Sequence, residues 1–441
     1  MTHPHFSRTQ LRRAVLSSYL GSVIEYYDFL LYATASAVVF NRVFFSDLDP
    51  LVGTVASFGV LATGYFARPL GGIVFGHFGD RIGRKKMLVL SMALMGVGST
   101  LIGVLPTYAQ IGVWAPILLV LLRVIQGIAV GGEWGGAVLM SAEHASSRRG
   151  LWASFTNAGA PSGVVLSSLV LALSAAATGE EQFLEWGWRI PFLLSIVLLA
   201  VGLFVRSRVT ESPVFAEASA ERPARPPLFE VLRHHPRNLL LSIGVGFGAF
   251  VAQATLTTFV ISYAVEVGFS RSTVLSALTL SSAVAIFGII GFSALSDRVG
   301  RRPVVLAGAA AMAIWVFVLF PLINSKSTLL LTLAVMVGQG IVHAAMYGPL
   351  AALYTELFST HTRYTGASLG YQISGIGAGL APVAFASVLA AGGGTVMVSI
   401  IIAVFCLLSV ACIVALQETA SADLTVDPDS TAAVPAISAS R

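Results

Sequence analysis

The sequence predicts an all-α integral membrane protein with twelve transmembrane helices in two six-helix halves. Three observations predict this fold. Hydrophobic residues make up 56% of the 441 residues and charged residues only 11%, whereas soluble domains carry about 25% charged residues. The apolar residues fall into runs of about twenty, the length that crosses a hydrocarbon layer of roughly 30 Å. A basic sequence string in the first half of the chain also returns in the second half.

Each predicted helix corresponds to one apolar window. The windows cover residues 15–42, 52–79, 86–106, 113–141, 151–177, 188–207, 239–265, 273–295, 303–323, 327–355, 364–391 and 396–417. The segment from Arg206 to Arg237 contains several prolines and mixed charges, and it separates six windows from six. The predicted organisation is therefore an N-terminal segment 1–14, a bundle 15–207, a linker 208–237, a bundle 238–418 and a disordered tail 419–441. The first apolar run has no cleavage site behind it, so we expect a retained helix and no signal peptide.

The basic residues predict the orientation, because short loops rich in Lys and Arg stay in the cytoplasm. With the N-terminus inside, 20 of the 26 Lys and Arg residues are cytoplasmic, four face outward, and Arg68 and Arg123 lie within the membrane. Both termini, the linker and the tail are therefore expected in the cytoplasm, with the protein in the inner membrane of a bacterium. The net charge of +5 follows from this topology, and no nucleic-acid partner is expected.

The repeated string reads D-R-x-G-R-[KR]. It occupies residues 80–85 and 297–302, which are 217 residues apart and at the same place in each half. Such a parallel duplication is typical of transporters whose halves rock about a central site. We expect Asp80 and Asp297 to bond helix N-termini or basic groups of the other half in one conformational state, and so to set the balance between states. The alternative is that the basic residues only fix the topology.

Five ionisable residues fall inside the predicted spans of the first half, and such residues are functional candidates by default. They are Glu25, Asp28, Arg68, Arg123 and Glu133. Glu25 and Asp28 share one helix face, so at least one of them is expected to hold a proton. The three carboxyl groups are therefore predicted proton-coupling sites, with the proton as coupling ion and no cofactor or metal. The alternative is permanent pairing, of Arg68 with Asp28 or of Arg123 with Glu133.

Arg123 is the first candidate to bind a solute carboxylate, because a guanidinium offers two parallel donors, and Arg68 is the second. Gly127 and Gly131 are expected to leave open space beside Arg123, and the glycine pairs around Glu133 to admit water. The further candidates for the lining of a pocket near the midplane are Tyr26, Tyr27, Gln126, Trp134, Asn157, Gln253 and Tyr347. Packing within the bundle is the alternative role for each of them.

The doubled string resembles the loop signature of the major facilitator superfamily. The stretches Ile24–Tyr32, Ala67–Gly72, Arg123–Gly127, Gly131–Ala137, Glu185–Phe192 and Arg363–Ser368 resemble the metabolite:proton symporter family, and within it the shikimate and related organic-acid importers most closely. The resemblance covers roughly residues 14–417. It implies a monomeric carrier that works by alternating access. The positions that match the gating motif are Gly76, Asp80, Arg81, Gly83, Arg84, Asp297, Arg298, Gly300 and Arg301.

The predicted function is secondary active import of a small organic acid, shikimate-like or another carboxylate, together with protons. One alternative is proton-coupled uptake of a zwitterionic osmolyte such as proline or betaine. Another is proton/drug antiport, because Gly159–Gly163 is similar to part of the glycine-proline element of antiporters. A sensor would need a larger output segment, and an enzyme would need a catalytic cluster. Gly366–Gly370 fits G-x-S-x-G but opens a membrane helix, so we expect a carrier that is not an enzyme.

Overall fold

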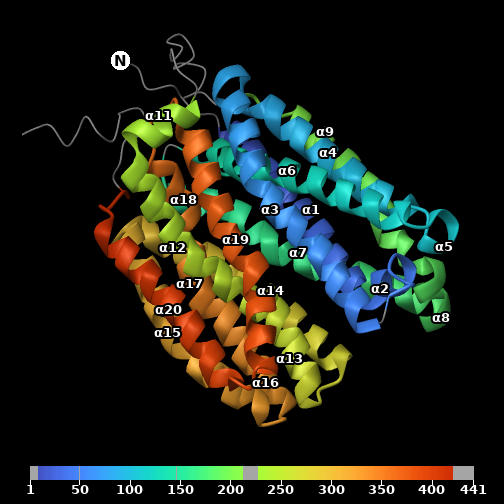
Figure 1. The fold of residues 1–441 in the computed structure, drawn as a ribbon. Helices are drawn as coiled ribbons and strands as arrows, with labels where there is room; N and C mark the ends of the chain where they lie inside the picture. The colour runs from blue at the N-terminus through green and yellow to red at the C-terminus, as the bar shows by residue number, and fades with distance from the viewer. Residues whose placement is uncertain (1–7, 49, 146, 212–226, 421–441) are drawn as a thin grey trace, which may run out of the picture.

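The computed structural model describes residues 8–48, 50–145, 147–211 and 227–420. Within these residues the regular structure is helical, and Figure 1 shows two groups of long helices that lie against each other. We call residues 8–211 the first half and residues 227–420 the second half. Both described ends of the chain lie at the same end of the molecule as α11 (Figure 1).

Six long helices form the first half. They are α1 (Arg8–Ala35), α3 (Pro50–Ile82), α4 (Arg84–Val104), α6 (Trp114–Glu143), α7 (Arg149–Thr178) and α9 (Arg189–Ser207). The short elements between them are a π-helical turn (Ser36–Phe40), α2 (Asn41–Val43), α5 (Tyr108–Ile111), α8 (Glu180–Gln182) and a second π-helical turn (Phe183–Gly187).

The second half begins with the short α11 (Pro227–His234). Its spans are α12 (Pro236–Ala254), continued through a π-helical turn (Thr255–Phe259) into α13 (Val260–Val267), then α14 (Arg271–Val299) and α15 (Arg301–Asn324). The fourth span contains α16 (Thr328–Val337), a π-helical segment (Gly338–His343), α17 (Ala344–Tyr347) and α18 (Leu350–Glu356). The last two are α19 (Arg363–Ala390) and α20 (Gly394–Ala415).

Ten helical stretches of the described residues are long and apolar enough to cross a membrane. The two other long helices, α1 with 28 residues and α3 with 33 residues, also exceed the roughly 20 residues that a span requires. The total agrees with the twelve windows of the sequence. Glu25 and Asp28 are buried inside α1, and their charges lower the mean hydropathy of that helix.

Three predicted boundaries are wrong. The first helix begins at Arg8 and not at residue 15, because its polar first turns continue the helix beyond its apolar part. Residues 227–234 of the predicted linker form α11, whose prolyl start and leucine-rich sequence favour a helix. Thr419, assigned to a disordered tail, is 8% exposed and bonded to Glu356. The remainder of that tail, residues 421–441, lies outside the described residues.

Two helix pairs join the halves along what we call the seam. α3 packs against α19, and α7 packs against α14. Each pair contains one helix from each half. Figure 1 shows that the far ends of the first half, near α2, α5 and α8, lie apart from the far ends of the second half, near α13 and α16. The opposite end of the bundle, which carries residues 80–84 and 297–301, is called the motif end below.

Glycine contacts set the helix spacing within the first half. A Cβ atom on Gly131 of α6 would lie 2.8 Å from Cα of Gly71 in α3, which is closer than real Cβ contacts allow. Gly127 of the same helix similarly faces Gly64 and Ala67 of α3. The expectation that both glycines leave open space is wrong for Gly131, where backbone of the neighbouring helix fills that space, as is common in membrane helices. Gly127 packs on the same helix and also lines a cavity beside Arg123.

Replacing Gly131 by alanine should destabilise the protein. The added methyl group overpacks the α3–α6 contact, at a cost of about 1–3 kcal/mol. Gly291 of α14 is a matched control, because a Cβ atom there meets no atom within 4 Å. Gly291→Ala should leave stability unchanged or raise it by about 1 kcal/mol through helix propensity. Thermal unfolding of the purified variants in detergent measures both effects, and equal melting temperatures for the two variants would contradict this account.

Candidate functional site

A small cavity inside the first half brings together four of the five predicted buried charges. Its lining contains Glu25, Asp28, Arg68 and Arg123, together with Gln126. They come from three helices: α1 carries the two carboxyl groups, α3 carries Arg68, and α6 carries Arg123 and Gln126. None of the five is more than 5% exposed. We call this space the charged cavity, and it places two cationic and two acidic side chains around one small volume.

Aromatic rings are the close neighbours of both arginines. The Arg123 guanidinium carbon lies 4.0 Å from the ring centroid of Tyr32, and that of Arg68 lies 4.5 Å from the ring of Tyr65. Such cation–π contacts stabilise a desolvated cation without neutralising its charge. Arg123 also donates a hydrogen bond of 3.1 Å to Oε1 of Gln126. The amide nitrogen of Gln126 in turn donates a hydrogen bond of 2.7 Å to the hydroxyl of Ser99. This contact orients the amide oxygen of Gln126 as an acceptor toward Arg123.

The described residues contain no ion pair of Arg68 or Arg123 with a carboxylate. The alternative of an Arg68–Asp28 or an Arg123–Glu133 pair is therefore not what the structure shows. Asp28 accepts a hydrogen bond of 2.7 Å from the hydroxyl of Ser195. Within the described part of the chain, Nε of Arg123 and Oε2 of Glu25 are buried without a hydrogen-bond partner. The cavity thus retains an unused hydrogen-bond donor and an unused acceptor, which suits a polar or charged solute.

Glu133 does not belong to this cavity. It forms a buried ion pair with Arg206 at the end of α9, and it accepts 2.7 Å from the hydroxyl of Ser91. Arg206 also donates to the backbone oxygen of Leu88. The sequence analysis counted Arg206 among the cytoplasmic basic residues, because it stands where the apolar run ends. In this conformation Glu133 is fully engaged, so the expectation of a hydrated carboxyl group between glycines is wrong.

A second small cavity lies at the seam, and we call it the second-half cavity. Its polar lining comes from the second half: Gln253, Thr257, Gln339, His343 and Tyr347. Ala160, Pro161 and Val164 of α7 close it from the first half. Thr257 lies in one π-helical turn, and Gln339 and His343 lie in another. π-Helical turns are frequent at functional sites because they redirect side chains within a helix.

Four of these five polar side chains are held by neighbours. Thr257 donates 2.8 Å to the backbone oxygen of Gln253, and the Tyr347 hydroxyl contacts that of Tyr371. Gln339 accepts 2.6 Å from the hydroxyl of Ser281 and donates 3.1 Å to that of Ser282. His343 places Nε2 at 3.1 Å from the backbone oxygen of Ala249. Gln253 has no such side-chain hydrogen bond among the described residues, so its amide is the freer group toward the cavity.

An aromatic cluster of Tyr26, Trp134, Tyr347 and Tyr371 lies across the seam. Trp134 stacks on Tyr371, with ring centroids 3.6 Å apart and planes 7° from parallel. The Tyr371 hydroxyl lies 3.3 Å from that of Tyr26 and 2.5 Å from that of Tyr347. Tyr371 was not among the predicted site residues, since one tyrosine in an apolar helix carries no sequence signal of its partners.

Two other predicted pocket residues are occupied elsewhere. Asn157 accepts 2.9 Å from Nε1 of Trp134 and donates 2.9 Å to the backbone oxygen of Tyr347, so it holds helices together. Tyr27 donates 2.8 Å to the backbone oxygen of Pro191 and is packed in the core of the first half. The prediction that Tyr27 lines the pocket is wrong, because it faces the opposite side of α1 from the cavity.

The repeated aspartates bridge the seam at the motif end. Asp80 accepts hydrogen bonds from the backbone nitrogen and the hydroxyl of Thr365, at 3.1 and 2.8 Å, in the first turn of α19. Asp297 accepts 2.8 Å hydrogen bonds from the backbone nitrogens of Gly150 and Leu151, in the first turn of α7. Each carboxylate therefore lies at the positive end of a helix in the other half. We call these two contacts the latch.

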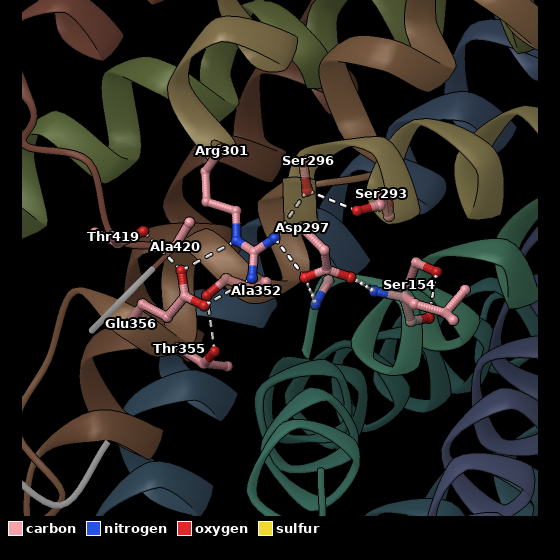
Figure 2. A network of polar contacts seen from close by, with 12 residues as sticks. Ser154, Ser293, Ser296, Asp297, Arg301, Ala352, Thr355, Glu356, Thr419 and Ala420 are labelled. Carbon is pink, nitrogen blue, oxygen red and sulfur yellow. Dashed lines mark hydrogen bonds and ion pairs between the residues drawn. The ribbon is translucent and has the colours of Figure 1, made fainter. Parts of the chain in front are cut away.

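A motif arginine pairs with a buried glutamate beside the latch in each half. Arg301 donates 2.7 Å to Asp297 and 3.1 Å to Glu356, and Figure 2 shows it between these carboxylates. In the first half Arg84 pairs with Glu143, and Glu143 also accepts 3.1 Å from Arg363 of the second half. Glu143 and Glu356 were missed because each closes an apolar window and carries no motif.

The glycines of the repeated string have structural reasons. Gly83 and Gly300 adopt positive φ angles of 111° and 105°, which favour glycine and turn the chain from one span into the next. A Cβ atom on Gly76 would lie 2.8 Å from Cα of Thr365, so this glycine allows α3 to approach α19. Arg81 and Arg298 are exposed and take no part in the latch in this conformation.

A further acidic residue closes each half at the motif end. Glu418 accepts 2.8 and 3.1 Å hydrogen bonds from the backbone nitrogens of Arg301 and Arg302. Glu211 accepts 3.2 Å from the backbone nitrogen of Lys85, at the matching place in the first half. The duplication thus extends beyond the repeated string. Thr419 donates 2.6 Å to Glu356, which joins this segment to Arg301 and Asp297 (Figure 2).

Breaking the Glu133–Arg206 pair from one side should destabilise the protein more than removing both charges. Glu133→Gln or Arg206→Met leaves one buried charge without its partner, which costs about 3–5 kcal/mol. The double variant Glu133→Gln/Arg206→Met should lie closer to the wild type, with a coupling free energy of about 1 kcal/mol or more. Chemical or thermal unfolding of all four proteins measures the cycle, and simple additivity of the two changes would contradict the pairing.

Comparisons with known proteins agree with this architecture. The sequence profile of the Major Facilitator Superfamily matches residues 19–294 and 266–438. The shikimate transporter of Escherichia coli K12 is 39% identical, over 91% of this chain and 94% of that protein. The proline/betaine transporter of Salmonella typhimurium LT2 is 32% identical, over 94% of this chain and 85% of that protein.

The crystal structure of the proton:xylose symporter XylE with 6-bromo-6-deoxy-D-glucose superposes with a TM-score of 0.75. It covers 93% of this chain and 97% of XylE at 19% sequence identity, and it therefore supports the fold. The predicted all-α fold of twelve membrane helices is confirmed, and the relatives are carriers and not enzymes. The chain belongs to the Major Facilitator Superfamily of multi-pass membrane transporters.

Proposed function

We propose that the protein imports a small organic anion together with protons, by alternating access between its halves. One observation carries the proposal: two buried arginines that have no carboxylate partner among the described residues share a cavity with Glu25 and Asp28. Burying a charge in the membrane costs free energy, so buried charged residues are as a rule paired or functional. A solute carboxylate supplies the missing negative charge for Arg123 or Arg68, and the two acidic side chains supply sites for protons. The similarity to the shikimate transporter supports this class of solute.

The mechanism that we propose uses the two cavities and the latch. The solute carboxylate binds in the charged cavity, and its polar remainder reaches Gln253 and Tyr347 in the second-half cavity. Protonation of Glu25 or Asp28 removes a negative charge that competes for the arginines. The motif end then opens, and the latch breaks, since its contacts exist only while that end is closed. Release follows on the other side, without covalent chemistry and with the proton as the only coupling species.

We place the protein as a monomer in the inner membrane of a bacterium, with both described ends of the chain in the cytoplasm. The excess of basic residues at the motif end supports this orientation. We propose that the two bundles predicted as residues 15–207 and 238–418, which the structure extends to Arg8 and to α11, rock against each other about the seam.

A zwitterionic osmolyte is the second candidate solute. The charged cavity offers cationic and acidic side chains together, which suits a molecule that carries both charges, and relatives include the proline/betaine transporter of Salmonella typhimurium. Uptake of labelled shikimate into proteoliposomes with an inward proton gradient distinguishes the two. Competition by shikimate, benzoate or oxoglutarate supports the anion, competition by betaine or proline supports the osmolyte, and no uptake or competition by any of them would refute both.

Replacing Arg123 or Arg68 by glutamine should reduce proton-driven uptake strongly. Loss of a charged hydrogen bond to the solute costs about 1.5–3 kcal/mol, or about ten- to a hundredfold in affinity. Arg123→Lys should recover only part of the uptake, because an ammonium cannot form two parallel hydrogen bonds to a carboxylate. Arg233→Gln is the control, because Arg233 is exposed on the short helix α11. Wild-type affinity of Arg123→Gln and Arg68→Gln in a binding assay would exclude these arginines from the solute site.

Replacing Asp297 by alanine should open the motif end. Its two hydrogen bonds to backbone nitrogens contribute about 3 kcal/mol together, which corresponds to about a hundredfold in the ratio of closed to open molecules. Spin labels at positions 82 and 299, where Ile82 and Val299 are 50% and 52% exposed, report the distance between the halves. Cys406 and Cys412 are first replaced by serine.

The label distance should increase in Asp297→Ala and in Asp80→Ala. Glu230→Gln is the control, because the ion pair of Glu230 is with His234 in the same short helix and does not cross the seam. An unchanged distance distribution in both aspartate variants would show that the latch does not hold the motif end closed.

A further inference from the structure

Tyr371 is the residue through which the aromatic cluster crosses the seam. It lies in α19 and is 1% exposed. Its ring stacks on Trp134 of the first half, while Phe250 of its own half meets the ring edge-on, at 4.7 Å between centroids and 74° between planes. Its hydroxyl contacts Tyr26 in one half and Tyr347 in the other. One side chain therefore makes a ring contact and a hydroxyl contact across the seam.

The contacts of Tyr371 close into a ring. Tyr371 stacks on Trp134, the indole nitrogen of Trp134 donates to Asn157, and Asn157 donates to the backbone oxygen of Tyr347. The hydroxyl of Tyr347 returns to that of Tyr371. Two members of this ring belong to the first half and two to the second. The halves cannot separate at this level until the stack of Trp134 on Tyr371 is broken.

The ring also borders the second-half cavity. Tyr347 lines that cavity, so a solute that enters it contacts this side chain. Tyr26 directly follows Glu25, which lines the charged cavity. The hydroxyls of Tyr347, Tyr371 and Tyr26 form a chain of hydrogen bonds that crosses the seam to α1, the helix that also carries Glu25 and Asp28. A tyrosine hydroxyl has a single proton to donate, so a new partner for Tyr347 changes what remains for Tyr371.

We propose that Tyr371 is a positioning residue that keeps the seam closed until a solute occupies the second-half cavity. A carboxylate or hydroxyl oxygen of the solute competes for the Tyr347 hydroxyl and releases that of Tyr371. Without the hydrogen bond to Tyr347, the Tyr371 ring is held less firmly against Trp134. The stack then breaks and the halves separate. This inference rests on the proposed function, because it explains how solute binding permits the movement. It adds that the hydrogen bond between the hydroxyls of Tyr371 and Tyr347 suppresses proton crossing when no solute is bound.

The variant Tyr371→Phe tests the proposal, since it keeps the ring and removes only the hydroxyl. Proteoliposomes carrying this variant should show a solute-independent proton leak about fivefold above that of the wild type, as expected for the loss of a buried hydrogen bond. An internal pH-sensitive dye measures the leak after an external acid jump without any solute. The steady-state accumulation of labelled shikimate should fall by about the same factor, while exchange of labelled for unlabelled shikimate continues.

Two further variants separate this role from a general effect on packing. Tyr354 is a matched control, because its ring contacts the aromatic cluster, 5.7 Å from that of Trp134, but its hydroxyl donates a hydrogen bond of 2.7 Å to the backbone oxygen of Ser242 within the second half. Tyr354→Phe should keep the wild-type leak and accumulation. Tyr347→Phe removes the same hydrogen bond from its other partner and should show the same leak as Tyr371→Phe. It therefore tests the proposal even where Tyr371→Phe folds poorly.

The outcomes are distinguishable from those that test the proposed function. A wild-type leak in both Tyr371→Phe and Tyr347→Phe overturns the inference, and so does an equal leak in Tyr354→Phe. Failure of the wild type to accumulate shikimate, betaine or their competitors refutes the proposed function alone, because the leak is measured without solute.

Discussion

A charge inside a membrane bundle needs an opposite charge, hydrogen bonds or water, because the lipid offers none of these. This requirement organises the protein. At the motif end, Asp80, Arg84, Asp297 and Arg301 each engage charged or backbone partners, and so does Glu133 with Arg206. In the charged cavity, Arg68 and Arg123 have aromatic neighbours in place of carboxylates. The first group keeps the structure together in this conformation, and the second remains able to bind a solute.

The duplication gives the seam an approximate symmetry. An aspartate of each half lies at the first turn of a helix in the other half, and an arginine and a glutamate behind each aspartate belong to its own half. The cavities do not share this symmetry. Charged side chains line the cavity of the first half, whereas amide, imidazole and hydroxyl groups line that of the second. The symmetric contacts at the motif end therefore serve the movement of the halves, and the two unlike cavities serve recognition of the solute.

The fold was predictable because its signals are local. Apolar length defines each span, and the repeated string marks the same loop in both halves. The residues of the charged cavity were also accessible, since an ionisable group within an apolar run is conspicuous. Partners were not accessible: Arg206 was placed in a loop, Tyr27 was placed in the pocket, and Glu143, Glu356 and Tyr371 were not singled out. Pairing across helices depends on rotation and packing about each helix axis, which one sequence does not specify.

The donor side of the Asp297 contact consists of the peptide groups of Gly150 and Leu151. A peptide N–H is present whichever amino acid occupies the position, apart from proline. A change of side chain at Leu151 can therefore leave the contact intact, whereas a Cβ atom on Gly150 would lie 2.7 Å from the backbone oxygen of Ser293. The two surfaces that bind each other thus tolerate mutation for different reasons: the donor side needs a close approach of backbone at one position, and the acceptor side needs the carboxylate of Asp297.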